Sequence, residues 1–207
     1  MSENNNPKPG LGLVRGTVSV LPHDEEWVNT GRQTIQKLKE ILGSTAADIQ
    51  HVGSTSINGV YAKPIIDLVI GVNDFRDILA MNDILAENGF YYRGQDLPGQ
   101  HLYVCGEGEI RTHHIHVVIY QDKNWVNYLT MRNYLNSHPE DAQKYSDLKR
   151  DLAEKYADDR NAYTAMKEDF IDSILYKASV ESARWGQTPS NTLISSAKCD
   201  PETRNLL

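Results

Sequence analysis

Hydrophobic residues in the first half of the chain form short alternating or continuous runs, the pattern of β-strands. The run Ile65–Val72 is apolar on both faces, which indicates a central strand covered on both sides of a sheet. Two helices are predicted between the strands: one begins at Asp24, a good N-cap residue, and ends at Gly43, and the other covers residues 74–88. The predicted strands are 16–21, 47–52, 65–72, 90–93, 102–105 and 113–120.

After Gln121 the hydrophobic residues recur three and four positions apart, which predicts three helices over residues 122–136, 139–156 and 161–184. We therefore expect an α+β fold. A mixed β-sheet core with flanking helices is expected over residues 11–121, followed by a C-terminal helical bundle over residues 122–185. The polar segments 1–10 and 186–207 are predicted to be a disordered N-terminus and a loosely held tail.

Composition narrows the class of protein. The 207 residues are 40% hydrophobic and 24% charged, as in ordinary globular proteins, and no apolar run is long enough for a membrane helix. A net charge of -7 argues against a general nucleic-acid coat protein, because nonspecific affinity comes from neutralising phosphates. The first ten residues lack the features of a secretory signal, and the two cysteines, Cys105 and Cys199, are far apart. A cytoplasmic location without membrane contact is expected.

The first candidate site is the turn Gly53-Ser54-Thr55, which precedes the central strand. Backbone N–H groups and hydroxyls at such a turn can bind phosphate oxygens, although an isolated tripeptide of this kind is more often a plain strand-to-turn junction. The strand that follows carries one acid, Asp67, which would be costly to bury unpaired. Lys63, just before the strand, could neutralise phosphate or pair with Asp67.

The second candidate is the segment from Arg111 to Tyr120, which contains three histidines within four residues. Strand alternation places His114 and His116 on one face, where they could reach one metal ion or one phosphate, while His113 should point away. Imidazole and carboxylate together suit zinc, so Asp67, His114 and His116 are candidate metal ligands if the two strands are adjacent. Alternatively, one of these histidines is a hydrogen-bonded core residue.

Basic residues on the predicted helices form a third set. Most alternate with acids and are expected to be solvated ion-pair partners. Lys149 and Lys167 differ because they lie close to stripes of aromatic residues and could face a cleft between sheet and helices. Tyr163 could stack on a base, although a place in the core is expected.

Several segments together resemble the GrpB family across residues 11–178. They are RGTVSVLPHDEEW, HVGSTSINGVYAKPIIDLVIGV, THHIHVV, MRNYLNSHPEDAQKYSDLKRDLAEKY and NAYTAMKEDFIDSIL. This family is similar to the nucleotidyltransferase superfamily, whose fold resembles the palm of DNA polymerase beta. The resemblance implies that Gly53-Ser54 holds a triphosphate and that Asp67 is the first acid of a pair binding two Mg²⁺ ions. The chain departs from that pattern at the second acid, where it has Val69, and at the third acid's strand, which carries His114 and His116.

The function expected from the resemblance is a nucleotidyltransferase-like enzyme that binds an NTP with Mg²⁺, or another divalent metal, and acts on a small-molecule acceptor. Asp67, His114 and His116 are the expected catalytic residues and metal ligands. The expected nucleotide and phosphate contacts are Gly53, Ser54, Thr55, Lys63, Arg111, Lys149 and Lys167.

Two alternatives remain open at this point. One is a non-catalytic nucleotide-binding accessory protein, which the missing second acid favours, and some relatives are fused to a coenzyme A biosynthesis kinase. The other is an aminoacyl-tRNA-dependent synthase of arginine-containing cyclic dipeptides, in which His114 or His116 would act as base and Asp67 or Glu168 would hold the guanidinium. In that reading tRNA is a partner.

Overall fold

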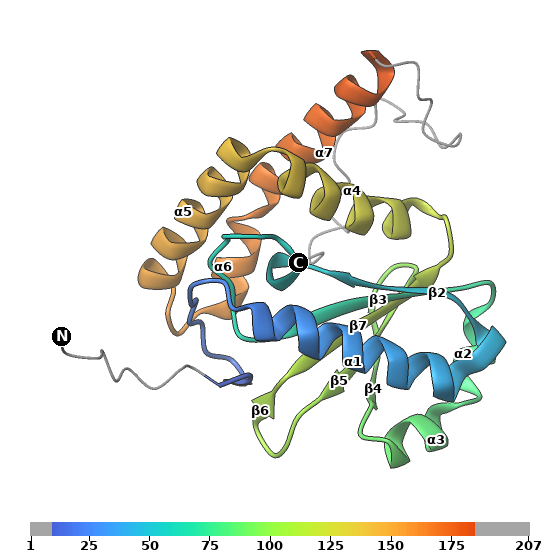
Figure 1. Ribbon diagram of the computed structural model, residues 1–207. Helices are drawn as coiled ribbons and strands as arrows, with labels where there is room; N and C mark the ends of the chain where they lie inside the picture. Colours follow the sequence, from blue (N-terminus) through green and yellow to red (C-terminus); the bar gives the residue numbers. More distant parts are fainter. Residues whose placement is uncertain (1–9, 185–207) are drawn as a thin grey trace.

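The computed structural model describes residues 10–184, which form a five-stranded mixed sheet flanked by helices (Figure 1). The strands are β1 (Leu13–Val14), β2 (Ala46–Val52), β3 (Ile66–Val72), β4 (Tyr91–Leu97), β5 (Gln100–Cys105), β6 (Ile110–Arg111) and β7 (His113–Ile119). The helices are α1 (Glu25–Leu42), α2 (Phe75–Leu79), α3 (Asn82–Glu87), α4 (Lys123–Ser137), α5 (Pro139–Lys155), α6 (Arg160–Ala165) and α7 (Glu168–Arg184), with short 3₁₀ turns η1 (Gly43–Thr45) and η2 (Ser54–Ser56). The predicted α+β class, with a sheet core followed by helices, is confirmed.

The main sheet has the order β2-β3-β7-β5-β4, so the two motif-bearing strands β3 and β7 are neighbours at its centre. They pair in parallel, and their register sets Asp67 opposite His114 and Val69 opposite His116. All the other pairings in this sheet are antiparallel. Strands β1 and β6 form a separate two-stranded ribbon.

One face of the sheet packs against α1, α2 and α3. Asp24 caps α1 by accepting a hydrogen bond from the Glu26 amide, and the helix buries Trp27, Leu38 and Leu42. These side chains meet alternate residues of the central strands, namely Ile66, Leu68, Ile70, Val72, Ile115 and Val117. The alternation expected from the sequence of β3 and β7 therefore holds.

The opposite face is covered by α4, whose Trp125 and Tyr128 pack on Val69 and Val118. Helices α5, α6 and α7 lie beyond the end of the sheet (Figure 1). There they enclose the loop between β2 and β3, because Ile57 and Val60 of that loop join a core cluster formed by α4, α5 and α7. The helical region is thus packed onto the segment that carries the Gly-Ser turn.

Three secondary-structure predictions need correction. Residues 16–21 are not a strand: Val18 donates its backbone hydrogen bond to Ala157 of the helical region, and Leu21 pairs only with Ala62 in an isolated bridge. The helix predicted over residues 74–88 is divided into α2 and α3 by a turn at Ala80–Met81. The helix predicted over 161–184 is divided into α6 and α7 at Met166–Lys167, and this break turns Lys167 into the interior.

The predictions for residues 1–9 and 186–207 lie outside the described residues. Between residues 10 and 184, no helix combines the length and the hydropathy needed to cross a lipid bilayer.

Gly53 links β2 to the η2 turn in a conformation that only glycine adopts readily, with φ of 66° and ψ of -171°. A Cβ atom at this position would lie 2.5 Å from Asp67 Oδ2. We expect Gly53→Ala to lower the free energy of unfolding by about 3 kcal/mol or more, the sum of backbone strain and steric overlap. Denaturant unfolding at neutral pH measures the change.

Gly59→Ala is the matched control, because Gly59 has a similar φ of 74° but open space where its Cβ would lie. It should cost only about 1–2 kcal/mol. Equal losses in the two variants would contradict the close approach of Gly53 to Asp67.

Candidate functional site

Asp67 lies at the start of β3, where the sheet ends against the β2–β3 loop and the helical region. Its Oδ1 atom is 3.4 Å from His114 Nδ1 and 3.7 Å from His116 Nε2. The side chain of Asp67 is 24% exposed to solvent and that of His114 is 17% exposed. The structure therefore brings the three predicted catalytic residues together and leaves Asp67 and His114 within reach of a ligand.

Burial alone would raise the pKa of Asp67, but the hydrogen bonds and charges of His114 and His116 outweigh it and hold the pKa well below its usual range. Asp67 is thus a carboxylate at neutral pH. Because its oxygen accepts from His114 Nδ1–H, the proton of a neutral His114 is fixed on Nδ1 and Nε2 is the free base. His116 is more buried, and its ring stacks on Tyr128 at 5.1 Å.

The Gly-Ser turn lies directly against this carboxylate. Gly53 approaches Asp67, and the backbone N–H of Ser56 donates to the Gly53 carbonyl at 3.2 Å, which closes the turn. Thr55 is fully buried and its hydroxyl bonds His51 Nε2 at 2.9 Å, so it supports the turn. Ser54 is half-buried and faces Tyr145, with which its side chain forms a hydrogen bond.

Three lysines from different segments surround the same carboxylate. Lys63 comes from the loop before β3, Lys149 from α5, and Lys167 from the α6–α7 break. Two of them are almost completely buried, with 2% of Lys149 and 4% of Lys167 exposed, while Lys63 is half-buried. Tyr163 contacts two of them, because its ring centroid is 4.3 Å from Lys63 Nζ and 4.6 Å from Lys167 Nζ. We call Lys63, Lys149 and Lys167 the lysine cluster.

Burial and nearby positive charges lower the pKa of every lysine in the cluster. The pKa of Lys167 falls to about 7 through burial and the charge of Lys63, and Asp67 opposes the fall. Burial and Arg160 lower the pKa of Lys63 to about 8. The pKa of Lys149 is lowered well below its usual value by burial and by the other two lysines. An anion placed among these amines would favour their charged forms.

The remaining buried histidines on the α1 side are structural. His113 Nε2 lies 3.1 Å from the Thr34 hydroxyl of α1, so it points away from Asp67 as expected. Burial lowers the pKa of both His51 and His113 to about 4, which keeps them neutral at physiological pH.

Arg111 is the predicted phosphate contact that the structure does not bring to the site. It lies in β6, and its guanidinium donates to the backbone carbonyls of Gly108 and Ile110 at 2.9 and 3.2 Å. It lines a hollow of about 300 Å³ beside Tyr91 and Arg93.

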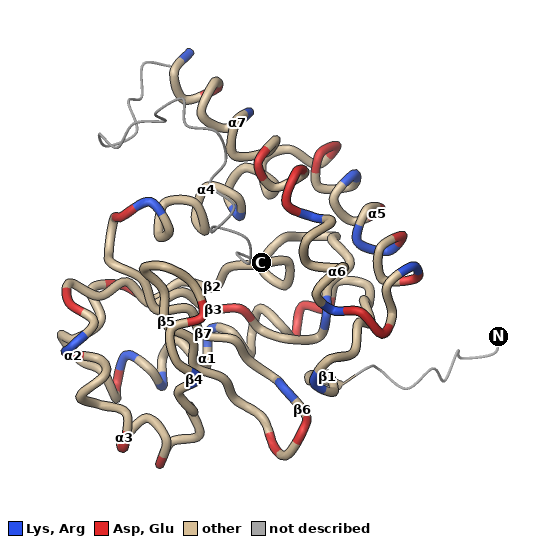
Figure 2. Tube along the Cα trace, turned by 180° about the vertical axis from the view of Figure 1, so that it is seen from behind, with Lys and Arg blue, Asp and Glu red and all other residues tan. Residues whose placement is uncertain are grey.

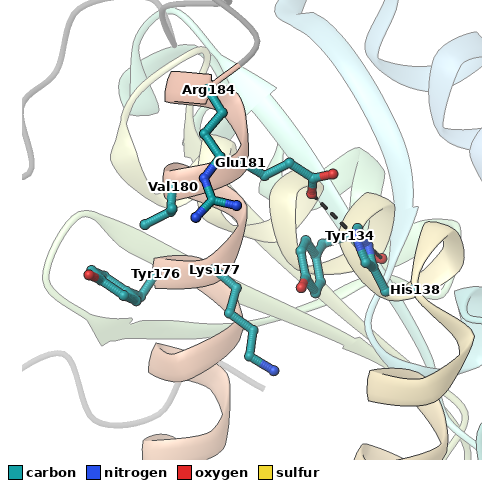
Figure 3. A pocket seen from close by; sticks show the side chains of 7 residues that line it. All are labelled: Tyr134, His138, Tyr176, Lys177, Val180, Glu181 and Arg184. Atoms are coloured by element: carbon teal, nitrogen blue, oxygen red, sulfur yellow. Dashed lines mark hydrogen bonds and ion pairs between the residues drawn. The ribbon is translucent and has the colours of Figure 1, made fainter.

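A larger hollow of about 740 Å³ lies between the ends of α4 and α7 (Figure 3). Tyr134 and His138 stack there at 3.8 Å, and His138 Nε2 is 3.3 Å from Glu181. None of the catalytic or lysine-cluster residues lines it. We place the candidate site at Asp67 because the groups whose pKa values are most strongly shifted by burial and by neighbouring charges are there. The charges in the wall of this hollow are exposed or lie in ion pairs near the surface.

The donor set at Asp67 does not fit the expected pair of magnesium ions. Magnesium prefers octahedral oxygen ligands, and two-metal sites use bridging carboxylates. Here one carboxylate stands beside two imidazoles, and Val69, at the position of the second acid, is fully buried under Trp125 and Tyr128. Within residues 10–184, no group of three or more His, Cys, Asp and Glu side chains is arranged to hold a metal ion.

The contribution of Tyr145 was missed in the sequence. Its ring lies 5.2 Å from Lys149 Nζ, and its hydroxyl meets Ser54. Burial raises its pKa to about 12, so the hydroxyl keeps its proton and can donate to a ligand. The signal was present in the i, i+4 spacing of Tyr145 and Lys149, which puts both on one face of α5.

Comparison with known proteins identifies the family. The family model described as "GrpB protein" matches residues 17–177. The chain belongs to the GrpB family. The Glutamate-rich protein GrpB of Alkalihalophilus pseudofirmus is 37% identical over 170 residues, 80% of this chain and 98% of that protein. UPF0157 protein YqkA of Bacillus subtilis is 30% identical over 84% of this chain, which spans only half of that longer relative.

A solved structure of the same family has the same fold. The crystal structure of conserved protein GrpB from Enterococcus faecalis superimposes with a TM-score of 0.73 at 30% identity, covering 80% of this chain and 99% of that one. A cytoplasmic RNA terminal U-transferase also matches, at 16% identity and a TM-score of 0.46 over 68% of this chain. That similarity is too distant to carry a conclusion about function.

The lysine cluster makes stability depend on pH above neutrality. In the unfolded chain Lys167 has a pKa near 10.5 and keeps its proton at pH 9, whereas the folded protein releases it above about 7. The unfolded state then binds more protons, so the free energy of unfolding rises between pH 7 and pH 9, by on the order of 2 kcal/mol from Lys167 alone. Denaturant unfolding at constant ionic strength measures this rise.

Lys167→Met should reduce the rise, because that variant has no amine to titrate at this position. Lys155→Met, which removes an exposed lysine at the end of α5, should leave the rise unchanged. A wild-type stability that is flat or falls over this range would contradict the lowered pKa values.

Proposed function

We propose that this GrpB-family protein is a nucleotidyltransferase-like enzyme that binds the phosphates of a nucleotide at the lysine cluster and transfers the nucleotidyl group to a small acceptor. The observation that carries the proposal is the convergence of three lysines, the Gly53-Ser54 turn and an Asp–His pair on one end of the sheet. Buried amines that repel one another are expected where an anionic ligand neutralises them.

The two halves of the site have different tasks in this proposal. Ser54, Tyr145 and the lysine cluster offer hydroxyl and ammonium donors to phosphate oxygens. Asp67 cannot donate, and its negative charge repels phosphate. Its place beside His114 instead suits it to orient a general base, as the aspartate does in Ser-His-Asp triads.

The transfer step uses His114 Nε2 as the proton acceptor. The acceptor's hydroxyl or amine attacks the α-phosphorus and forms the new bond, while the bond from the α-phosphorus to the bridging oxygen breaks and its electron pair leaves with pyrophosphate. The proton of the attacking group passes to His114, and Asp67 stabilises the resulting imidazolium. The ammonium groups offset the charge on the departing pyrophosphate.

Charge elsewhere on the protein does not suggest a broad nucleic-acid surface. Figure 2 shows Lys and Arg interspersed with Asp and Glu along α5. A compact anionic ligand held by one cluster fits this distribution better than an extended polyanion.

His114→Ala should lower pyrophosphate release by about 10²-fold or more, because general-base catalysis contributes about 10²–10⁴ to the rate. Its affinity for ATP should stay within about threefold of wild type, since His114 is assigned to the acceptor. The measurement is pyrophosphate release with each NTP over a panel of hydroxyl and amine acceptors, with nucleotide affinity determined separately by calorimetry.

His138→Ala is the control, as His138 lies with Tyr134 and Glu181 in the hollow between α4 and α7. It should keep full activity. Binding of NTPs without pyrophosphate release from any acceptor would reject the transferase and leave a nucleotide-binding accessory protein. The absence of binding to every NTP would reject both.

A further inference from the structure

We infer that the lysine cluster, rather than a divalent metal, neutralises the ligand's phosphate charge, so that this site binds nucleotides without metal. The inference rests on the proposed function and specifies how its phosphate subsite works. It starts from the disagreement between the Mg²⁺ expected of the family resemblance and the donors that the structure assembles.

The cationic groups come from several segments around the site: the loop before β3, α5, α6 and the α6–α7 break. The amines of Lys63 and Lys167 both lie over the ring of Tyr163, and that of Lys149 lies over the ring of Tyr145. Arg160, at the start of α6, acts electrostatically on Lys63 and Lys167. Asp67 acts electrostatically on all three lysines, each of which carries a positive charge when its amine is protonated.

Asp67 is poorly placed to serve as a metal ligand. His114 and His116 both approach its Oδ1 atom, and Gly53 packs closely against Oδ2. Position 69 supplies no second oxygen, because Val69 is sealed under α4. A metal ion among the lysine amines would in addition face the repulsion of up to three positive charges.

Tyr163 gives an independent sign of a missing ligand. The residue is completely buried, and its hydroxyl has no hydrogen-bond partner among the described residues 10–184. A buried hydroxyl without a partner is unfavourable, and an oxygen of a phosphate bound at the lysine cluster would be a suitable acceptor for it.

The two modes of binding predict opposite effects for one substitution. If Mg²⁺ on Asp67 holds the phosphates, Asp67→Asn removes the metal ligand and abolishes binding. If the lysines hold them, Asp67→Asn removes a negative charge beside the phosphates, and affinity stays equal or increases. Lys149→Met should weaken binding by at least about tenfold, the loss expected for one charge-assisted hydrogen bond.

The experiment is calorimetric titration of the full chain with ATP and, separately, with tripolyphosphate, in excess EDTA and in MgCl₂. The proteins are wild type, Asp67→Asn, Lys149→Met, Lys63→Met and the control Lys155→Met. Lys63 is half-buried, so Lys63→Met tests the cluster even if the fully buried Lys149→Met does not fold. Circular dichroism checks the fold of each variant.

The expected result is ATP binding in EDTA at least as tight as in Mg²⁺, retained in Asp67→Asn and Lys155→Met and weakened in both cluster variants. Binding that requires Mg²⁺ and disappears in Asp67→Asn would overturn the inference and leave the proposed function intact. Binding of no nucleotide under either condition would instead reject the proposed function.

Discussion

The ionised carboxylate of Asp67 is the constraint on which the arrangement of this end of the protein depends. A charge at the end of an apolar strand must be compensated, and two segments do so: β7 supplies two imidazoles, and the helical region adds the positive charges of its lysines. A third segment, the β2–β3 loop, packs Gly53 against the carboxylate. Glycine at position 53 is needed because any side chain there would overlap the carboxylate. These three segments therefore pack around the carboxylate of Asp67.

This arrangement also explains why the helical region packs on the loop between β2 and β3. Hydrogen bonds fix that loop to α4 and α5: Asn136 bonds the backbone at Ser56 and Asn58, and Ser146 Oγ accepts from the Tyr61 amide. Apolar contacts of Ile57 and Val60 with the helices add burial. The lysines of α5 and of the α6–α7 break are therefore held against the sheet by the same segment that forms the Gly-Ser turn.

The local features of the site could be predicted from the sequence, but the gathering of its charged groups could not. Period-two alternation in β3 and β7 places Asp67, His114 and His116 on one face, and pairing of the two strands brings them together. The burial of Lys149 and Lys167 could be suspected from their nearness to aromatic stripes. Their convergence on Asp67 could not, because it depends on long-range packing and on the break between α6 and α7, where a continuous helical pattern hid a turn. The strand expected at residues 16–21 failed for a similar reason, since its hydrogen-bond partner lies in the helical region.

The charge of a bound phosphate could be neutralised by metal ions held on β3 carboxylates or by the lysine amines. The burial of Val69 argues against the first of these. An acid at that position would have to displace the contact with Trp125 and Tyr128 that packs α4 on the sheet, and it would be desolvated there. Packing α4 over the sheet is therefore incompatible with a second carboxylate on β3. The ammonium groups of α5 and of the α6–α7 break lie outside that interface, at the place proposed here for the phosphates. They also differ from metal ions in one respect: their pKa values are lowered by burial, and a ligand that brings negative charge would favour their protonated forms.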